Sequence, residues 1–375
     1  MGGLGELQRL NVAYPNRPTV ARSVRAISRQ APLALLIAPA VYFLVGPTSG
    51  SVPLLLVIGF TSCFLTVTLG LTATLNGLGD FRSPAIRLGG ARLLAGAAAI
   101  AVATVEPEPA AVLACFGAAE AFGAGALALS VRSVRSRLPD VDHPDAHLHR
   151  DRHWFGTAGL VYLVTNQADT LLVSSILTPE GLGLYATAST LENGVATFAT
   201  SAAMPTTFRA IGSTLRGETD LGAHLLRRAF AVAAFLAIVL AVCGWIGAEL
   251  IGGSIGKLAP LTEGDGPLVL ALCLAAGPLA AAVAICLLVG AGYGRHRPVG
   301  VRQIQVGICA IVAIVAGALV AGPVGAAAGM IVRDLAGLLI TKGLTKPPSP
   351  AEMPAESEGA EAIAIPPPGA SPAEP

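Results

Sequence analysis

Long apolar runs recur along the chain, and they constrain its fold more than any other feature. A helix needs about 20 consecutive apolar residues to cross a bilayer. The segments that approach or exceed this length are 30–46, 52–75, 86–105, 110–130, 154–177, 182–204, 228–251, 266–291, 299–321 and 323–341. Only 13% of the 375 residues are charged, against about 25% in soluble domains. The sequence therefore predicts an all-α integral membrane protein with about ten transmembrane helices.

Basic residues alternate between the two sides of this predicted topology. With the N-terminus in the cytoplasm, the cytoplasmic segments contain nearly all of the 24 lysines and arginines, and the outer connections contain only Lys257. Cytoplasmic loops of membrane proteins carry such an excess of Lys and Arg. We therefore expect a multi-pass protein of the cytoplasmic membrane with both termini in the cytoplasm.

The connections divide the predicted helices into two unequal groups. Residues 1–29 form a basic cytoplasmic segment that lacks the apolar run of a signal peptide. Residues 30–130 hold four predicted helices, a partial first lobe, and the cytoplasmic loop 131–153 follows. Residues 154–345 hold six helices, the second lobe. Residues 346–375 are rich in Pro and Glu without periodicity, which predicts a disordered tail.

The sequence contains no pattern typical of an enzyme or a cofactor-binding protein. Its six cysteines all fall in apolar runs without a CxxC pair, so they are predicted to be core residues rather than disulfide partners or metal ligands. Four histidines cluster in the loop 131–153, where solvation explains them as well as a metal site does. No phosphate-binding Gly motif, nucleophile elbow or zinc signature is present, and the net charge of +1 gives no case for nucleic acid. We therefore expect no enzyme, cofactor or metal.

Charged residues inside the predicted helices are the best candidates for function, because each costs about 2.5–3.5 kcal/mol at the bilayer centre. Measured from the outer helix ends at about 1.5 Å per residue, Glu120, Glu192 and Arg333 lie about 15 Å deep. Asp169 lies about 12 Å deep and Arg92 about 20 Å. Transporters place their substrate and coupling-ion sites at this level.

Polar residues recur at helical spacing beside two of these charges. Tyr162, Asn166 and Asp169 share one face of the fifth predicted helix. The sixth carries Ser189, Glu192 or Asn193, Thr197 and Thr200. Such faces must turn toward other helices or water. The predicted substrate- or ion-binding residues are Arg92, Glu120, Asn166, Asp169, Glu192, Asn193 and Arg333.

Some of these residues also have a structural explanation. Arg92 is close to the cytoplasmic end of its helix and can extend its guanidinium to the interface. Arg333 can pair with its neighbour Asp334 or with Glu120. The GxxxG pair at 325–329 is typical of close helix packing.

One stretch in the middle of the chain, residues 167–210, reads QADTLLVSSILTPEGLGLYATASTLENGVATFATSAAMPTTFRA. It has an Asp in mid-span (Asp169), a short outer turn, a Gly-x-Tyr-x-x-Ala motif at 183–188, and Pro205, where the helix is expected to end. With these features it resembles the start of the second lobe in polysaccharide-exporting flippases. These are the oligosaccharidyl-lipid flippases of the multidrug/oligosaccharidyl-lipid/polysaccharide exporter superfamily. Loosely, the similarity covers residues 1–345.

The resemblance implies a fold and a function. Family members have twelve to fourteen helices in two six-helix lobes, so it implies a two-lobed flippase-like bundle that here lacks the first helix hairpin. It implies flipping of a lipid-linked oligosaccharide, on an undecaprenyl-diphosphate-type carrier, to the outer leaflet by alternating access. Arginines of the cavity would hold the diphosphate and sugar acids, and midplane carboxylates would carry a coupling proton or sodium ion. Membrane lipids and polysaccharide assembly proteins are the other expected partners.

Three other functions stay open. A drug or cation antiporter of the same superfamily would need a strongly acidic lumen, whereas the predicted lumen has charges of both signs. A membrane-embedded polysaccharide polymerase or glycosyltransferase would need a large outer loop with catalytic residues, and the outer connections are short. A non-transporting scaffold is the third alternative.

Overall fold

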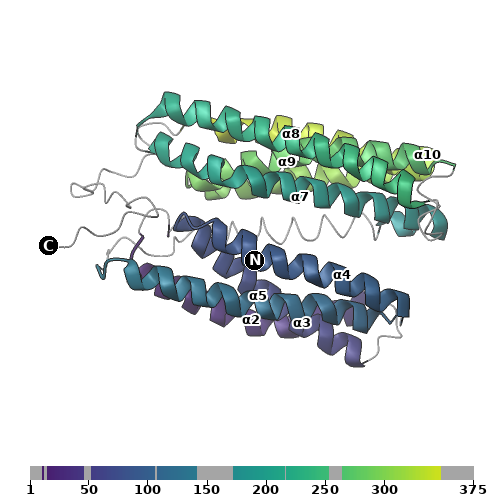
Figure 1. The fold of residues 1–375 in the computed structure, drawn as a ribbon. Helices are drawn as coiled ribbons and strands as arrows, with labels where there is room; N and C mark the ends of the chain where they lie inside the picture. Colours follow the sequence, from purple (N-terminus) through teal and green to yellow (C-terminus); the bar gives the residue numbers. More distant parts are fainter. Residues whose placement is uncertain are drawn as a thin grey trace.

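The fold is a pair of helical bundles. The computed structural model describes residues 11, 15–45, 52–105, 108–141, 172–215, 217–252 and 264–347. These residues are helical and contain no strand. Figure 1 shows the two bundles lying side by side. Asn166, Asp169, the four loop histidines and residues 348–375 lie outside the described residues.

The first bundle, which we call the first lobe, contains the helices up to residue 137. Its elements are α2 (Arg17–Val45), α3 (Val52–Gly77), the π-helix η1 (Pro84–Leu88), α4 (Gly89–Val105) and α5 (Pro109–Arg137). α3 packs between α2 and α5, and α4 packs on α5. The core of this lobe is a small group of aliphatic side chains that includes Ile27, Leu75 and Leu127.

The second bundle, or second lobe, has the larger core. Its elements are α7 (Pro179–Leu215), α8 (Thr219–Gly252), α9 (Gly266–Gly292), α10 (His296–Thr341) and the 3-10 helix η3 (Lys342–Thr345). α7 packs on both α8 and α9, and α9 packs on α10. Tyr185, Leu270, Ile285, Ile314 and Met330 are fully or almost fully buried in this core.

Five of the described helices are long and apolar enough to cross a membrane. They are α3, α5, α8, α9 and the long α10. α4 has only 17 residues, and α2 and α7 carry more polar side chains. The predicted class, an all-α integral membrane protein, is confirmed.

Two helices extend beyond their predicted bounds at the basic ends of the first lobe. α2 begins at Arg17, well before residue 30, because Asn16 Oδ1 accepts the N–H of Thr19 at 2.8 Å and caps the helix. α5 continues to Arg137, into the predicted loop 131–153. Arginine is a good helix former, so these basic segments prolong the helices instead of ending them.

The expectation that a helix ends at Pro205 is wrong. α7 continues past this residue to Leu215. Proline removes a single backbone donor, here the partner of the carbonyl oxygen of Ser201, and membrane helices tolerate such a loss. Nearby, the hydroxyl of Thr207 donates to the carbonyl oxygen of Ala203 at 3.0 Å.

The last two predicted spans form a tight hairpin within α10. The chain reverses at Ala321 and Gly322, where Gly322 has a φ of 58°. Beyond the turn the backbones of Gly317 and Gly325 touch, and a Cβ on Gly329 would lie 2.6 Å from the carbonyl oxygen of Ala313. The close packing predicted for the GxxxG pair is therefore confirmed.

The arginine-rich connections lie at one end of the molecule. Arg17 Nη2 donates to the carbonyl oxygen of Ser136 at 2.8 Å and joins the start of α2 to the end of α5. In the second lobe Arg295 Nη1 donates to the carbonyl oxygen of Leu344 at 3.3 Å. We call this the arginine-rich end. It is the end predicted to be cytoplasmic.

Candidate functional site between the two lobes

The two lobes meet at the arginine-rich end. Asn76 Nδ2, at the end of α3, donates to Met204 Sδ of α7 at 3.3 Å. The rings of Phe81 and Phe208 stack with centroids 5.9 Å apart and an interplanar angle of 18°. An amide contact and an aromatic stack therefore join α7 to the α3–α4 connection.

The connection that carries Phe81 is held by its own hydrogen bonds. The carboxylate of Asp80 accepts the backbone N–H of Ser83 at 3.0 Å and its hydroxyl at 2.6 Å. Gly79 has a φ of 81°, a conformation that favours glycine. Because these bonds fix both sides of Phe81, its ring is presented to α7 in a defined position.

The residues of α7 that meet the first lobe belong to a longer row along one helix face, which we call the α7 row. Its members are Thr187, Thr190, Gly194, Thr197, Ser201, Met204 and Phe208. Steps of three and four residues keep such a row on one side of a helix. Since Met204 and Phe208 contact the first lobe, the whole row faces that lobe. Its members from Thr187 to Ser201 are exposed, and the two contact residues are partly covered.

The exposed part of the α7 row carries hydroxyl groups and no charge. Thr187 and Thr190 each donate their hydroxyl hydrogen to the carbonyl oxygen four residues earlier, at 2.8 and 2.7 Å. Their oxygens remain available as acceptors. The face that α7 turns to the first lobe is therefore neutral, polar and rich in hydrogen-bond acceptors.

An ion pair between a buried carboxylate and a half-exposed arginine links α4 and α5 within the first lobe. Arg92 Nε donates to Glu120 Oε1 at 2.6 Å, and the hydroxyl of Thr68 in α3 donates to Glu120 Oε2. The Glu120 side chain is 8% exposed, whereas that of Arg92 is 42% exposed. The carboxylate is thus fixed from the interior, and its arginine reaches the surface.

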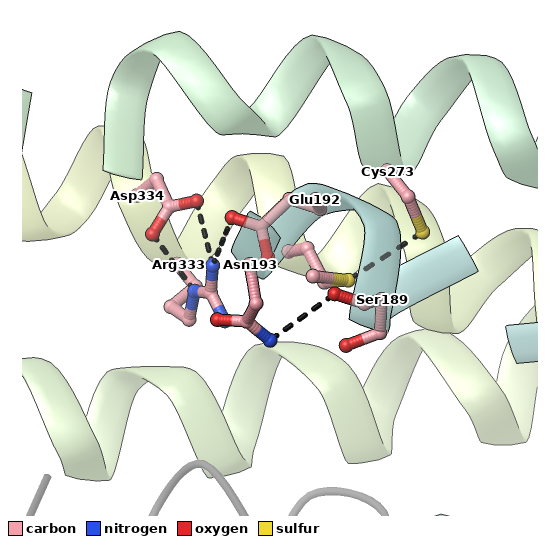
Figure 2. Close-up of polar contacts among 7 residues, drawn as sticks. Ser189, Glu192, Asn193, Cys273, Arg333 and Asp334 are labelled. Carbon is pink, nitrogen blue, oxygen red and sulfur yellow. Dashed lines mark hydrogen bonds and ion pairs between the residues drawn. The ribbon is translucent and has the colours of Figure 1, made fainter. Parts of the chain in front are cut away.

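A second cluster, shown in Figure 2, links α7 and α10 within the second lobe. Arg333 binds Asp334 through Nε and Nη2, both at 2.8 Å, and Nη2 also donates to Glu192 Oε1 at 3.2 Å. The Arg333 side chain is 11% exposed and Glu192 is fully buried. Cys273 of α9 lies on the other side of Glu192, with its Sγ 3.6 Å from Met330 Sδ. Arg333 is therefore bound to two carboxylates and almost fully enclosed by the second lobe.

The predicted site residues fall into these two clusters. The structure brings Arg92 to Glu120, and Arg333 to Asp334 and Glu192, but each cluster stays within its own lobe. The suggestion that Arg333 pairs with Glu120 is therefore wrong. From the observed outer helix ends both clusters lie about 17–20 Å deep, so they do share one level.

The residues of the polar stripe predicted on the sixth span lie on different sides of α7. Ser189 and Glu192 are buried inside the second lobe, while Thr197 is exposed on the α7 row. Asn193 Nδ2 donates to the carbonyl oxygen of Ser189 at 3.1 Å, within its own helix. The roles of the predicted residues in binding stay predictions.

Sequence reasoning missed the contact residues and most of the α7 row. Asn76, Phe81, Met204 and Phe208 carry no charge and do not stand out in an apolar sequence. The sequence does contain one signal for the α7 row, the spacing of three and four residues between its members from Thr187 to Ser201. The charge of Glu192 instead favoured the neighbouring face, which turns out to be the packed one.

Solved structures with a similar fold are membrane transporters. The Vibrio cholerae MATE transporter VcmN in the bent form has a TM-score of 0.56 and 14% sequence identity, covering 92% of this chain and 83% of that chain. The fold is that of the MATE transporters. An outward-facing multidrug resistance MATE family transporter of the MOP superfamily gives a TM-score of 0.56 at 14% identity, over 91% and 81% of the two chains. A MATE protein in complex with MaL6 gives 0.54 at 13% identity, over 91% and 82%.

The likeness to MATE transporters concerns the fold. No family model matches the sequence, and no curated protein matches it either. The MATE fold agrees with the superfamily expected from residues 167–210, of which one neighbour is a member. The multidrug neighbour corresponds to the drug antiporter, one of the alternatives given above. The fold therefore does not distinguish the two substrates, and the distinction has to come from the residues of this chain.

Proposed function

We propose that this protein is a transporter that moves a lipid-linked oligosaccharide across the cytoplasmic membrane by alternating access of its two lobes. The observation that carries the proposal is the α7 row, a neutral face of hydroxyl groups that one lobe turns toward the other. The MATE fold supports transport by two lobes. The resemblance of residues 167–210 to oligosaccharidyl-lipid flippases supports the substrate and its undecaprenyl-diphosphate-type carrier.

The α7 row suits a substrate rich in hydroxyl groups. Sugar hydroxyls donate hydrogen bonds, and the oxygens of Thr187 and Thr190 accept them. Two exposed apolar side chains lie beside the row, Leu191 and Phe198. They offer an apolar surface for the carrier lipid. A pathway that is polar along one line and apolar beside it matches a sugar attached to a hydrocarbon.

The buried carboxylates bear on the choice between this substrate and an organic cation. A cationic drug needs an acidic site, because its charge must be neutralised inside the membrane. Glu120 is paired with Arg92, and Glu192 and Asp334 share Arg333. Among the described residues, the first cluster is thus neutral, whereas the second has two carboxylates and one arginine and keeps one negative charge when both carboxylates are ionised. The drug antiporter of the same superfamily is the second candidate, and the multidrug neighbour favours it.

The contact between the lobes would close the pathway between them at the arginine-rich end. Phe81 and Phe208 stack at the arginine-rich end, while the α7 row is exposed from Thr187 to Ser201. Opening this contact and closing the opposite end would move the exposed face of the row from one side of the membrane to the other.

The test measures flipping with the hydroxyls of the row removed. In proteoliposomes, Thr190→Val combined with Thr197→Val should lower the flipping rate of a lipid-linked oligosaccharide about tenfold, because several sugar hydrogen bonds lose their acceptors. Thr207→Val is the matched control, since it removes a hydroxyl from the buried side of the same helix. It should leave the flipping rate of the folded protein unchanged.

A second substrate separates the two candidates. Export of a cationic dye by the same proteoliposomes, with no flipping of the oligosaccharide lipid, would identify a drug antiporter and overturn the proposal. Equal flipping by the row variant and the unmodified chain would also overturn it, because the α7 row would then have no part in the pathway.

A further inference from the structure

The contact between the lobes has one exposed arginine from each lobe beside it. Arg82 follows Phe81 in the α3–α4 connection, and Arg209 follows Phe208 in α7, so each arginine is next in sequence to one of the two stacked rings. Within the described part of the chain, neither guanidinium forms an ion pair or a hydrogen bond. Each lobe therefore presents an unpaired positive charge at the contact.

The acidic residue of the same connection is already engaged. The carboxylate of Asp80 accepts both the backbone N–H and the hydroxyl of Ser83, at 3.0 and 2.6 Å. These bonds hold it to its own turn. The connection itself therefore supplies no counter-charge to Arg82 or Arg209.

Another segment of the chain has the complementary charge. Residues 348–375, which lie outside the described residues and which we call the acidic segment, contain five glutamates and no Asp, Lys or Arg. Four of these glutamates are close together, at 352, 356, 358 and 361. The acidic segment thus concentrates negative charge in a stretch of ten residues.

The acidic segment starts at the arginine-rich end, close to the end of α7. Arg295 Nη1 donates to the carbonyl oxygen of Lys346 at 3.0 Å, and its Nη2 donates to that of Pro347 at 3.4 Å. Two residues earlier, the hydroxyl of Tyr293 donates to Thr214 Oγ1 of α7 at 3.3 Å. The last described residue is therefore held on the same side of the second lobe as the end of α7.

The glutamates of the acidic segment can reach both arginines. Arg209 lies five residues before Thr214, about 7.5 Å along α7. Residues 348–361 span up to about 46 Å when extended, at about 3.3 Å per residue. The stacked rings next to the two arginines have centroids only 5.9 Å apart. One stretch of glutamates can therefore contact Arg209 on one lobe and Arg82 on the other.

Covalent attachment compensates for the weakness of exposed ion pairs. A single pair between exposed side chains contributes little to stability. A segment of the same chain, however, is present at an effective concentration in the millimolar range. Several glutamates that alternate on two arginines then suffice for binding.

We propose that residues 352–361 bind Arg82 and Arg209 and bridge the two lobes at the arginine-rich end. The bridge would have to be released before this end opens, so the acidic segment would slow the transport cycle. The inference deepens the proposed function by naming a regulation, and it rests on that function for the effect on flipping. The binding of the segment is a separate property with its own test.

The test of binding uses photo-crosslinking on the full chain in phosphatidylcholine nanodiscs. The photoreactive amino acid p-benzoylphenylalanine replaces Ser357, and mass spectrometry of tryptic peptides identifies the crosslinked residues. We expect crosslinks to the residues around Arg82 and Arg209. Arg82→Gln combined with Arg209→Gln should lower their yield about fivefold, and so should about 1 M salt on the unmodified arginines, because the Debye length falls to about 3 Å. The salt measurement does not depend on the folding of a variant.

The matched control removes one exposed arginine from each lobe away from the stack. Arg87→Gln combined with Arg228→Gln makes the same change in net charge, and Arg87 Nη1 donates to the carbonyl oxygen of Ala126. This control should keep the crosslink yield of the unmodified arginines. An equal loss in both double variants would reduce the effect to general charge attraction and overturn the site.

Two other occupants of this surface are outcomes of the same experiment. Crosslinks that join isotope-labelled to unlabelled chains would place the segment on a second copy and overturn the bridge. Crosslinks that disappear when phosphatidylglycerol is added to the nanodiscs would assign the arginines to anionic headgroups, with the same consequence. Crosslinks elsewhere in the chain, or none, would also overturn it.

The effect on transport is measured separately. Substitution of the four glutamates at 352, 356, 358 and 361 by Gln should abolish the crosslinks and raise the flipping rate about threefold, because the bridge no longer holds the lobes together. An unchanged rate without crosslinks would overturn the regulation. Crosslinks at both arginines in a chain that flips no oligosaccharide lipid would overturn the proposed function and leave the binding standing.

Discussion

Each lobe contains an arginine–carboxylate cluster at the same depth, yet the two clusters use their arginines differently. In the second lobe Arg333 is bound to Asp334 and Glu192 and is 11% exposed. In the first lobe Arg92 is bound to Glu120 alone and is 42% exposed. The second cluster joins α7 to α10, whereas the first joins α4 to α5.

The difference in exposure indicates that the Arg333 cluster is structural, whereas the guanidinium of Arg92 is accessible from outside its lobe. Removing one partner of an enclosed ion pair leaves a charge buried without compensation, which is strongly destabilising. A half-exposed pair is less costly to disturb, because its arginine is not enclosed by the protein. Substitution of Arg333 is therefore expected to cost more stability than substitution of Arg92, although both arginines lie at the same depth.

The largest effect is expected at the enclosed cluster. Arg333→Gln would leave Glu192 and Asp334 buried without a cation, at a cost of about 3–5 kcal/mol. The melting temperature in detergent and the yield of folded protein would both fall. Arg228→Gln, an exposed arginine of α8, is the control and should stay within about 0.5 kcal/mol. A stable Arg333→Gln protein would show that this cluster is not structural.

The close packing of α10 gives the next effect. A Cβ at Gly329 would lie 2.6 Å from the carbonyl oxygen of Ala313, whereas one at Gly123 of α5 would meet the tip of the Leu88 side chain at the same distance. Backbone cannot move aside as a side chain can, so Gly329→Ala should cost about 1–3 kcal/mol. Gly123→Ala should be nearly neutral in thermal unfolding, because alanine also favours the helix. Equal costs would mean that the two lobes are packed alike.

The open cluster should be the more tolerant of the two. Arg92→Gln leaves Glu120 buried with only Thr68 as a partner, for a loss of about 1–3 kcal/mol. Adding Glu120→Gln should recover most of that loss, since no buried charge remains. Thermal unfolding of the two variants checks this order. A loss as large as that of Arg333→Gln would remove the distinction between the clusters.

The smallest effect on stability is expected on the α7 row. Thr190→Val changes an exposed hydroxyl and should stay within about 0.5 kcal/mol. Thr207→Val, on the buried side of α7, should cost about 1 kcal/mol, because its bond to Ala203 is lost. The melting temperatures of the two variants give the comparison. The reverse order would place the row in the packed interior.

The sequence predicted the helical framework well, because apolar length and charge alternation are local properties. It placed the reversal of α10 between residues 321 and 323, where the structure has it. Helix ends were less predictable. α7 continues past Pro205, since proline removes only one backbone donor and membrane helices tolerate this loss, and α2 begins in a segment whose arginines suggested only a basic connection.

The partners of Arg333 could be predicted, Asp334 as its neighbour in sequence and Glu192 from the depth that the two residues share. The pairing of Arg333 with Asp334 was one of two alternatives in the sequence. The pairing of Arg92 with Glu120 depends on how α4 packs on α5, which no local pattern specifies. The exposed face of α7 likewise depends on which side α8 and α9 cover, so the sequence could not show that Glu192 and Thr197 lie on different sides of this helix.

The spacing of the α7 row has a geometric consequence. A repeat of 3.5 residues lags an ideal helix by about 20° per heptad, and the row from Thr187 to Phe208 runs through three heptads. Its two ends therefore point in directions about 60° apart. When Phe208 faces Phe81, Thr187 therefore lies about 60° round the helix from the direction of that contact, still on the half of α7 that is turned to the first lobe. A substrate that follows the row would thus have to rotate by about this angle as it passes from one end of α7 to the other.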